Sequence, residues 1–581
     1  MIGNGTSNPF PVNWTDVSCS SDVTSNITIG MADLSAQLNS TSIQLVAKNN
    51  ITDQAGVSVT GTTGTLIFQA GNVSLTGAYN VAGGLVFNVT GTALVAGVIS
   101  GSGGLTQAGT GTTILAANNT YSGLTAINGG TLQVGNGGTT GTLGTGNVTD
   151  SANLTFNISG TTTVSGLISG TGSLTQAGTG TAILTANNTY SGITTISAGT
   201  LQVGNGGAAG KLGSGTVTDN SALVFNVSTP ATINTLIAGT GNLTQTGAGT
   251  LILTANNTYS GGTTINAGTT LQIGNGGATG NLGTGAIADN GNLVFNTTGT
   301  TTITPVISGS GNLSQAGTGT TVLTANNTYA GSTTISGGTL QIGNGGTTGS
   351  LGTAATVTDN ANLTFNLGGT TTLNTVIAGT GNLTKAGAGT VILAANNTYA
   401  GTTTISAGTL QVGNGGTAGS LGAGNVVDSA ALVFNLSSPA TVANLISGGG
   451  RLTQAGTGTV ILTANNTYSG GTTINAGTTL QVGNGGASGN LGSGAITDNG
   501  DLIVNTTGTT TIAPVISGSG NLSQVGTGTT VLTANNTYAG STTISAGTLQ
   551  IGNGGTTGSL GTAATVTDNA NLTLTSMPSR P

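Results

Sequence analysis

Internal repetition constrains the fold of this chain more than any other feature. The tetrapeptide Asn-Asn-Thr-Tyr occurs seven times in 581 residues, and consecutive copies follow one another at an almost constant 69–70-residue spacing. A fixed internal period is typical of repeat architectures, in which each unit buries its apolar face only against its neighbours. We therefore expect a solenoid and not several globular domains. The tyrosines that mark the copies are Tyr121, Tyr190, Tyr259, Tyr329, Tyr399, Tyr468 and Tyr538.

A longer period lies over the first one. The segment Gly331 to Thr364 recurs at Gly540 to Thr573 with a single change, from Gly337 to Ala546. Such similarity indicates the duplication of a block of three repeats.

A shorter period lies inside each repeat. Strand-like segments are centred on Leu105, Leu132 and Leu154, and the next repeat starts at Leu174. Apolar and polar residues alternate around each leucine, which is typical of a strand with one buried face. The steps between these leucines suit one coil of a β-solenoid with parallel strands stacked about 4.8 Å apart. We predict an all-β fold, a parallel β-helix of roughly 24 coils with three coils per 69–70-residue repeat.

The leucines then form an internal ladder, and a second inward column is expected beside it. This column contains Phe in five copies, then Val, then Leu, which are substitutions that an apolar core tolerates. Its members are Phe156, Phe225, Phe295, Phe365, Phe434, Val504 and Leu574.

We divide the chain into three regions. Residues 1–40 differ in composition, contain the lone cysteine Cys19, and are expected to form an N-terminal cap or remnant region. Residues 41–573 form the β-helix, with clear repeats from about residue 101. Residues 574–581 leave the repeat in mid-strand, and we interpret them as a non-repeat tail produced by a frameshift or by a truncated gene.

Composition excludes several classes of function. Only 3% of the residues are charged, His is absent, and all twelve acidic residues are Asp. The five basic residues cannot form the positive stripe that nucleic acid requires. No apolar run is long enough for a membrane-spanning helix, and the N-terminus has no basic and apolar segments typical of a signal peptide.

One Asp recurs in every repeat, shortly before a strand leucine. The two interpretations are a row of calcium or catalytic carboxylates and an Asx turn at the start of the strand. Calcium requires six to eight converging oxygens, and equivalent Asp residues are separated by a whole repeat, so we favour the Asx turn. These residues are Asp150, Asp219, Asp289, Asp359, Asp428, Asp498 and Asp568.

Three further motifs have both a structural and a functional interpretation. Gly-Asn-Gly-Gly runs resemble phosphate-binding loops, but no Lys-Ser/Thr follows them, so we expect turns. Asn118-Asn119-Thr120 and its equivalents match a glycosylation sequon, yet an amide-bearing turn is favoured. Asp498 and Asp501 are the closest acidic pair, and Asp501 is a single-copy variation. We therefore assign no catalytic, cofactor-binding or metal-binding residue, and we expect no cofactor and no enzyme activity.

The repeat unit at Gly172 to Gly204, with its Leu-Thr-Gln-Ala-Gly, Asn-Asn-Thr-Tyr and Thr-Leu-Gln-Val-Gly segments, strongly resembles the autotransporter-associated β-strand repeat. The resemblance extends from Gly101 to about Thr573 in seven copies. It implies the passenger region of a bacterial type V secretion protein, a right-handed parallel β-helix (β-solenoid) displayed outside the outer membrane. The family's C-terminal membrane barrel has no counterpart in this chain.

We therefore expect a non-catalytic, extracellular stalk or adhesin at the bacterial cell surface. Its expected partners are a host or neighbouring-cell surface or a second copy of the chain, and not nucleic acid. Two alternatives stay open. One is a carbohydrate-active β-helix enzyme. The other is an ice- or surface-binding solenoid, which runs such as Thr300-Thr301-Thr302 and Thr509-Thr510-Thr511 suggest.

Overall fold

The computed structural model describes residues 26–29 (backbone only), 34–35, 38–39, 42–53, 56, 58–353, 356–562 and 565–575. The chain divides into two compact units, Met1–Leu293 and Val294–Pro581. Each unit is a solenoid of short parallel β-strands, as predicted.

Each repeat folds into strands of two to four residues. Val, Ile, Leu and Thr supply the strands, because their side chains suit a pleated, half-buried surface, and Gly-rich segments supply the corners between them. Exposed and buried residues alternate along most strands, so every second side chain points into the solenoid. In the first repeat the strands are β11 (Leu105–Gln107), β12 (Thr112–Leu115), β13 (Thr125–Ile127), β14 (Thr131–Val134), β15 (Val148–Asp150), β16 (Asn153–Phe156), β17 (Thr161–Val164) and β18 (Ile168–Ser169).

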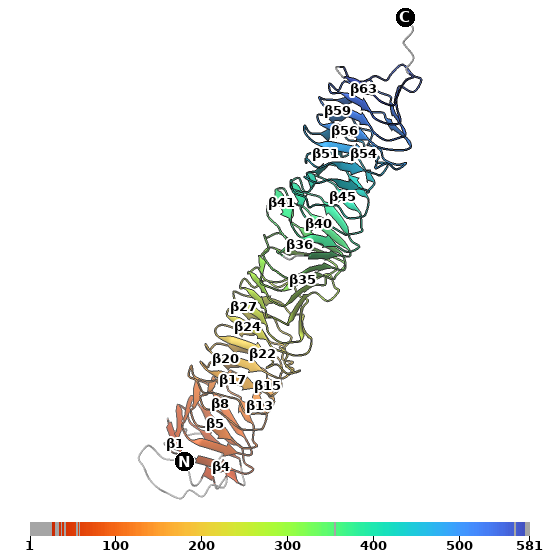
Figure 1. Ribbon diagram of the computed structural model, residues 1–581. Helices are drawn as coiled ribbons and strands as arrows, with labels where there is room; N and C mark the ends of the chain where they lie inside the picture. The colour runs from red at the N-terminus through yellow and green to blue at the C-terminus, as the bar shows by residue number, and fades with distance from the viewer. Residues whose placement is uncertain are drawn as a thin grey trace. The chain divides into compact units, whose positions relative to one another are not determined.

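The cross-section has three sides, because each segment pairs with the third segment after it. Thus β11 pairs in parallel with β13, and β12 pairs with β14. Two sides of each repeat are made by single bridges and not by full strands, as at Asn118 and Thr142. One sheet of the first unit contains β5 (Leu66–Ala70), β8 (Leu85–Val89), β11 and β13 in this order, and β5, β8 and β13 can be followed in Figure 1.

A repeat therefore contains ten sides, of which eight are strands and two are bridge segments. With three sides to a turn, it makes three and one-third turns. The 64 strands and the 14 segments of the seven bridges give 78 sides in the described residues, which is about 26 turns. The predicted fold class is confirmed. The prediction of three coils per repeat was one-third of a turn too low. Over the whole array this difference lowered the predicted total to roughly 24 coils, against about 26 turns in the structure.

The predicted leucine ladder is correct in part. Leu132, Leu154 and Leu174 do stack on one another in successive turns. Leu105, however, pairs with Thr125 and not with Leu132. The longer step from Leu105 to Leu132 passes four sides instead of three, so the motif moves to the next face of the solenoid in every repeat.

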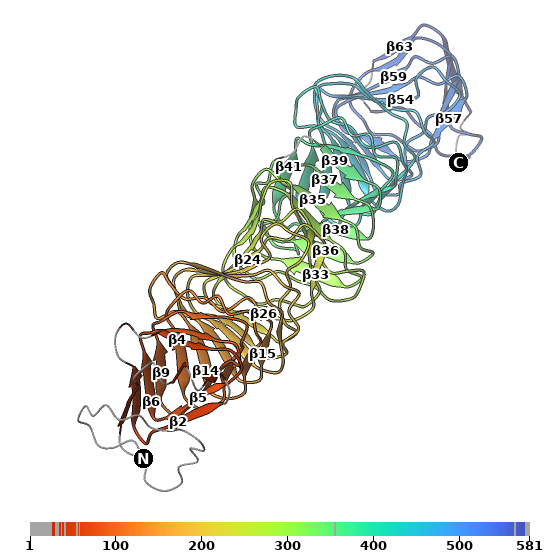
Figure 2. The same cartoon turned by 90° about the horizontal axis from the view of Figure 1, so that it is seen from below.

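The interior of each unit is apolar. The predicted Phe column is buried from Phe156 to Val504, and only its last member, Leu574, is exposed. All seven Asn-Asn-Thr-Tyr tyrosines are buried as well. The turns before the first repeat have a more aromatic interior, in which Phe87 stacks on Phe68 and Tyr79 meets Phe68 edge-on. Figure 2 shows β6 (Asn72–Leu75), β9 (Thr92–Val95) and β14, which belong to one sheet of the first unit.

The solenoid begins inside the region predicted as a cap. Strand β1 (Asn26–Ile29) pairs in parallel with β3 (Asn50–Asp53). Cys19 and residues 576–581 of the predicted tail lie outside the described residues.

Candidate functional site

The outer surface of the solenoid is the first candidate site, and it carries very few charges. In the described residues, three exposed basic side chains, Lys48, Lys211 and Arg451, face outward. Among the nine aspartates that the structure describes, three are not buried, Asp53, Asp501 and Asp568. These six charges lie on 21913 Å² of surface. Thr, Asn, Ser and Gly therefore supply almost all polar contacts that this surface can make.

The longest exposed run of the first repeat, residues 136–140, begins inside the Gly-Asn-Gly-Gly segment, and this segment forms a turn as predicted. In the first copy Gly135 and Gly137 have φ values of 83° and 79°, which glycine adopts without strain. The Gly137 N–H donates to the Asn157 carbonyl, 2.8 Å away. The Gly135 N–H donates to the Leu115 carbonyl as well, and no helix follows the segment, unlike in a phosphate-binding loop.

The Asn-Asn-Thr-Tyr segment is an amide-bearing corner, as favoured from the sequence. Asn119 is buried, and its Oδ1 accepts from the Ile99 N–H while its Nδ2 donates to the Thr142 carbonyl. Asn118 is exposed, and its Oδ1 accepts from the Gly141 N–H at 2.9 Å. Both amides hold neighbouring turns together, so the sequon has a structural role.

The recurring aspartates form the predicted Asx turns. In the first copy, Asp150 Oδ1 accepts from the Ala152 N–H at 3.0 Å. The same bond recurs at every later copy, including Asp568.

The structure adds a feature that the sequence pattern did not show. Six of these seven aspartates are 0–1% exposed, and the Oδ2 atom of each has no hydrogen-bond partner. The six are Asp150, Asp219, Asp289, Asp359, Asp428 and Asp498.

Five of the six buried carboxyl groups lie against a glycine of the following turn. A Cβ atom on Gly172 would lie only 2.2 Å from Asp150 Oδ1, and Gly381 and Gly520 stand in the same relation to Asp359 and Asp498. A side chain at these glycines would collide with the carboxyl group. The next turn thus closes these five carboxyl groups off from water.

Burial changes the acidity of these groups. Desolvation raises the pKa of Asp150, Asp219, Asp289 and Asp359 from 3.8 to about 6, although the Asx-turn N–H partly opposes it. The pKa of Asp498 rises to about 7, because burial acts together with the nearby charge of Asp501. Burial also raises the pKa of Asp428, against the opposing charge of Arg451.

The acidic residues do not converge on a common site. Asp150 and Asp219 lie in different sheets of the first unit, because the repeat advances by one side beyond three full turns. No group of three or more potential metal ligands occurs in the described part of the chain. Asp501 is half-buried at the start of β56 (Asp501–Val504), where its Oδ1 accepts from Asn521 Nδ2 at 2.9 Å.

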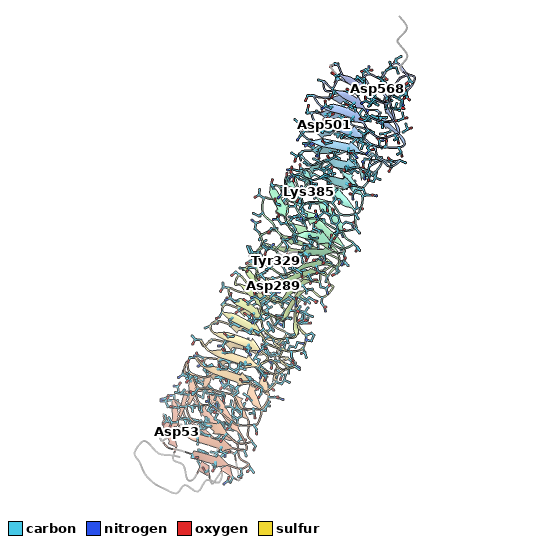
Figure 3. The ribbon with its side chains drawn as sticks, in the orientation of Figure 1. Asp53, Asp289, Tyr329, Lys385, Asp501 and Asp568 are labelled. Atoms are coloured by element: carbon cyan, nitrogen blue, oxygen red, sulfur yellow. The ribbon has the colours of Figure 1, made fainter. Side chains whose placement is uncertain are left out.

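Lys385 is a buried group that sequence reasoning missed. It is 1% exposed at the position where other repeats have a buried Gln (Figure 3). Its Nζ donates to the carbonyls of Gly387 and Ala407, as Gln107 Nε2 donates to Gly109 and Gly111. Burial lowers the pKa of this amine. The signal was visible in the sequence, where the Gln column contains a single Lys.

The threonine runs place their side chains on both faces of their strands. In β33 (Thr300–Ile303) and β57 (Thr509–Ile512), the middle threonines Thr301 and Thr510 point inward and are buried. In β57, Thr510 Oγ1 shares a hydrogen bond with Thr506 Oγ1 at 2.9 Å. Thr509 stacks on Thr529 and then on Thr548, whereas Val531 stands opposite Thr511 on the next turn. Only one of the two outward Thr positions of this strand therefore continues from turn to turn.

Comparison with known proteins identifies the repeat. The model of the passenger-associated-transport-repeat family matches seven segments, each from a Leu-Thr/Ser-Gln/Lys strand to the following Leu-Gln-Val/Ile strand. These seven segments are passenger-associated transport repeats. The matched residues are 105–134, 174–203, 243–273, 313–342, 383–412, 452–482 and 522–551.

One relative of these repeats is a named adhesin. The chain is 39% identical over 205 residues to the "Adhesin BmaC autotransporter" of Brucella suis biovar 1 (strain 1330). The matched stretch is 32% of this chain but only 6% of that protein. No solved structure matches the chain. Among the described residues, no helix combines the length and apolar character needed to cross a bilayer.

Proposed function

We propose that this passenger array is a non-catalytic, adhesin-like stalk displayed on a bacterial surface. The observation that carries the proposal is the likeness of its repeats to part of an autotransporter adhesin. Passenger repeats of this family imply a secreted or surface location. The expected partner is a host cell, a neighbouring bacterium or a second copy of the chain.

The surface chemistry supports adhesion through many weak contacts. The outward side chains are mainly hydroxyls and amides, and the six outward charges are equally divided in sign. A surface with so little charge has weak long-range repulsion toward another surface. Contacts repeated along the chain then add their effects through multivalency.

The distribution of the acidic residues supports a non-catalytic role. Glycosidase chemistry needs two carboxyl groups facing one substrate bond. Here six of the nine described aspartates are buried singly, and Asp501 bonds to a neighbouring Asn. No pair of carboxyl groups in the described residues is offered to a bound sugar.

The test is adherence by surface display. The chain is fused to a heterologous autotransporter barrel in a non-adherent laboratory strain, and its exposure is verified by protease shaving of intact cells. We expect adherence to cultured epithelial cells or to neighbouring bacteria to exceed that of the bare barrel and to fall when three repeats are deleted. Adherence equal to that of the bare barrel, with the passenger verified at the surface, contradicts the proposal.

A further inference from the structure

The six buried aspartates form a group of sites that adhesion does not use. An ionised carboxylate in an apolar interior is very unfavourable unless it is paired or well hydrogen-bonded. Each of these groups has an Asx-turn hydrogen bond to Oδ1, and its Oδ2 has no hydrogen-bond partner. A second backbone N–H, that of Leu363 or Leu432, also acts on Asp359 and Asp428. A protonated carboxyl group fits such a site far better than a carboxylate.

The groups that face these carboxyls offer little charge compensation. Tyr190 of the next repeat faces Asp150, and Tyr399 faces Asp359 in the same way. These tyrosines are neutral, and their hydroxyls already share hydrogen bonds with Thr194 and Thr403.

Two of the six buried aspartates differ from the other four, because a charged side chain lies near their carboxyl group. Asp428 faces Tyr468 and also feels the charge of Arg451, and Asp498 faces Tyr538 and feels Asp501. These two sites are natural controls, since Arg451 favours the carboxylate and Asp501 opposes it.

We propose that the six buried aspartates act as a proton-coupled lock on the passenger fold. Each carboxyl takes up a proton when the following turn closes over it and releases the proton when that turn opens. The folded array is therefore tighter in an acidic medium and loosens as the medium becomes neutral. This behaviour does not depend on the adhesin role.

The direction of the effect follows from linkage. An acid whose pKa is higher in the folded state binds protons more tightly there, so its contribution to stability is fully present below the unfolded pKa of about 3.9. That contribution is lost as the pH rises through the folded values of about 6 to 7. A difference of about two pKa units corresponds to about a 100-fold change in the opening equilibrium of each site.

Hydrogen exchange on the whole chain tests the lock. Protection factors, corrected for the intrinsic exchange rate at each pH, are measured at pH 4.5, 6 and 7.5. We expect amides of β39 (Thr356–Asp359) to lose about 25-fold in protection over this range, because the first part of the 100-fold loss falls below pH 4.5. In the Asp359→Asn variant, whose neutral amide imitates the protonated acid, this loss should disappear. Asp568→Asn, at the exposed equivalent position, should change nothing.

Two results would overturn the proposal. The first is pH-independent protection of β39 in the unmodified chain. The second is an Asp359→Asn variant that is less protected than the unmodified chain at pH 7.5, which would show that the site holds a carboxylate, for instance through an internal water. If Asp359→Asn failed to fold, the infrared band of protonated carboxylic acid in the unmodified chain at pH 5.5 would decide the question, because only buried aspartates remain protonated there.

Discussion

Repeats four and seven, both in the second unit, give nearly the same sequence two different environments. Residues 331–364 and 540–573 differ only at Gly337 and Ala546. Yet Asp359 is fully buried, whereas its equivalent Asp568 is exposed and lies in β63 (Val566–Asp568; Figure 3). The same contrast separates Val357, which is 1% exposed, from Val566, which is 38% exposed.

The difference shows where the burial of a repeat comes from. Strand β39 is covered by β42 (Val376–Ala378), and β40 (Asn362–Phe365) by β43 (Asn382–Lys385). No strand after β64 (Asn571–Leu574) occurs in the described residues. A repeat thus encodes its strands and turns, but the next turn supplies its core. Stability in such a chain is close to a sum over neighbouring turns.

The strongest test of this comparison is the Phe column. Phe365 is 1% exposed and Leu574, at the equivalent position, is 72% exposed. Phe365→Ala should cost about 3–5 kcal/mol of local stability, because it leaves a cavity in a closed turn. Leu574→Ala should cost less than about 0.5 kcal/mol. Hydrogen exchange of β40 and β64 measures both, and equal costs would contradict the neighbour-supplied core.

The second test displaces the turn that closes over Asp359 and leaves the sequence of β39 unchanged. A Cβ on Gly381 would lie 2.3 Å from Asp359 Oδ1, so Gly381→Ala must push the next turn away from the carboxyl. We expect a loss of about 1–3 kcal/mol, as for other overpacked cores. Gly346→Ala is the control, because Gly346 is exposed and its nearest neighbour would be 3.6 Å away. Comparable destabilisation by both substitutions would show that loss of glycine, and not the closed contact, is responsible.

Much of this arrangement could be predicted from the sequence. Local signals were sufficient for the strands, the inward Phe column and the Asx turn at Asp359, since each depends on neighbouring residues in the chain. The four-sided step was also within reach. The step from Leu105 to Leu132 is longer than the steps to Leu154 and Leu174 that follow it, by about the length of one short strand and its corner.

The closure of the Asp sites could not be predicted in this way. The glycine that covers Asp359 is Gly381, which lies on the following turn and outside the Asx-turn segment. Which glycine meets which carboxyl depends on the register between turns, and the sequence alone left that register undetermined. The burial of Lys385 was not predicted for a different reason. A lone Lys indicates an exposed side chain, and only its alignment with the buried Gln residues of the other repeats indicates that it is buried.

A third test uses the natural charge neighbours of two Asp sites. The Arg451 charge partly offsets the raised pKa of Asp428. In Arg451→Gln that opposition is lost, so β47 (Val426–Asp428) should lose more protection between pH 4.5 and 7.5, by roughly three- to tenfold. Asp501→Asn should have the opposite, smaller effect at Asp498. An unchanged pH profile in both variants would show that neighbouring charges do not reach the buried carboxyls.

The smallest expected effect concerns the residue that covers Phe365. Lys385 stands opposite Phe365 on the next turn, and burial lowers the pKa of its amine. The folded state therefore favours the neutral amine, so this site should gain stability as the pH rises toward 10.5, opposite in sign to the aspartates. In Lys385→Gln that alkaline gain should vanish, while stability at pH 7 changes by less than about 1.5 kcal/mol. The small cost is expected because Gln176, Gln245 and Gln454 already occupy this position with an unpartnered Oε1. Thermal melts of both proteins at pH 7 and pH 10 measure the difference, and parallel pH profiles would show that Lys385 stays charged beneath its neighbours.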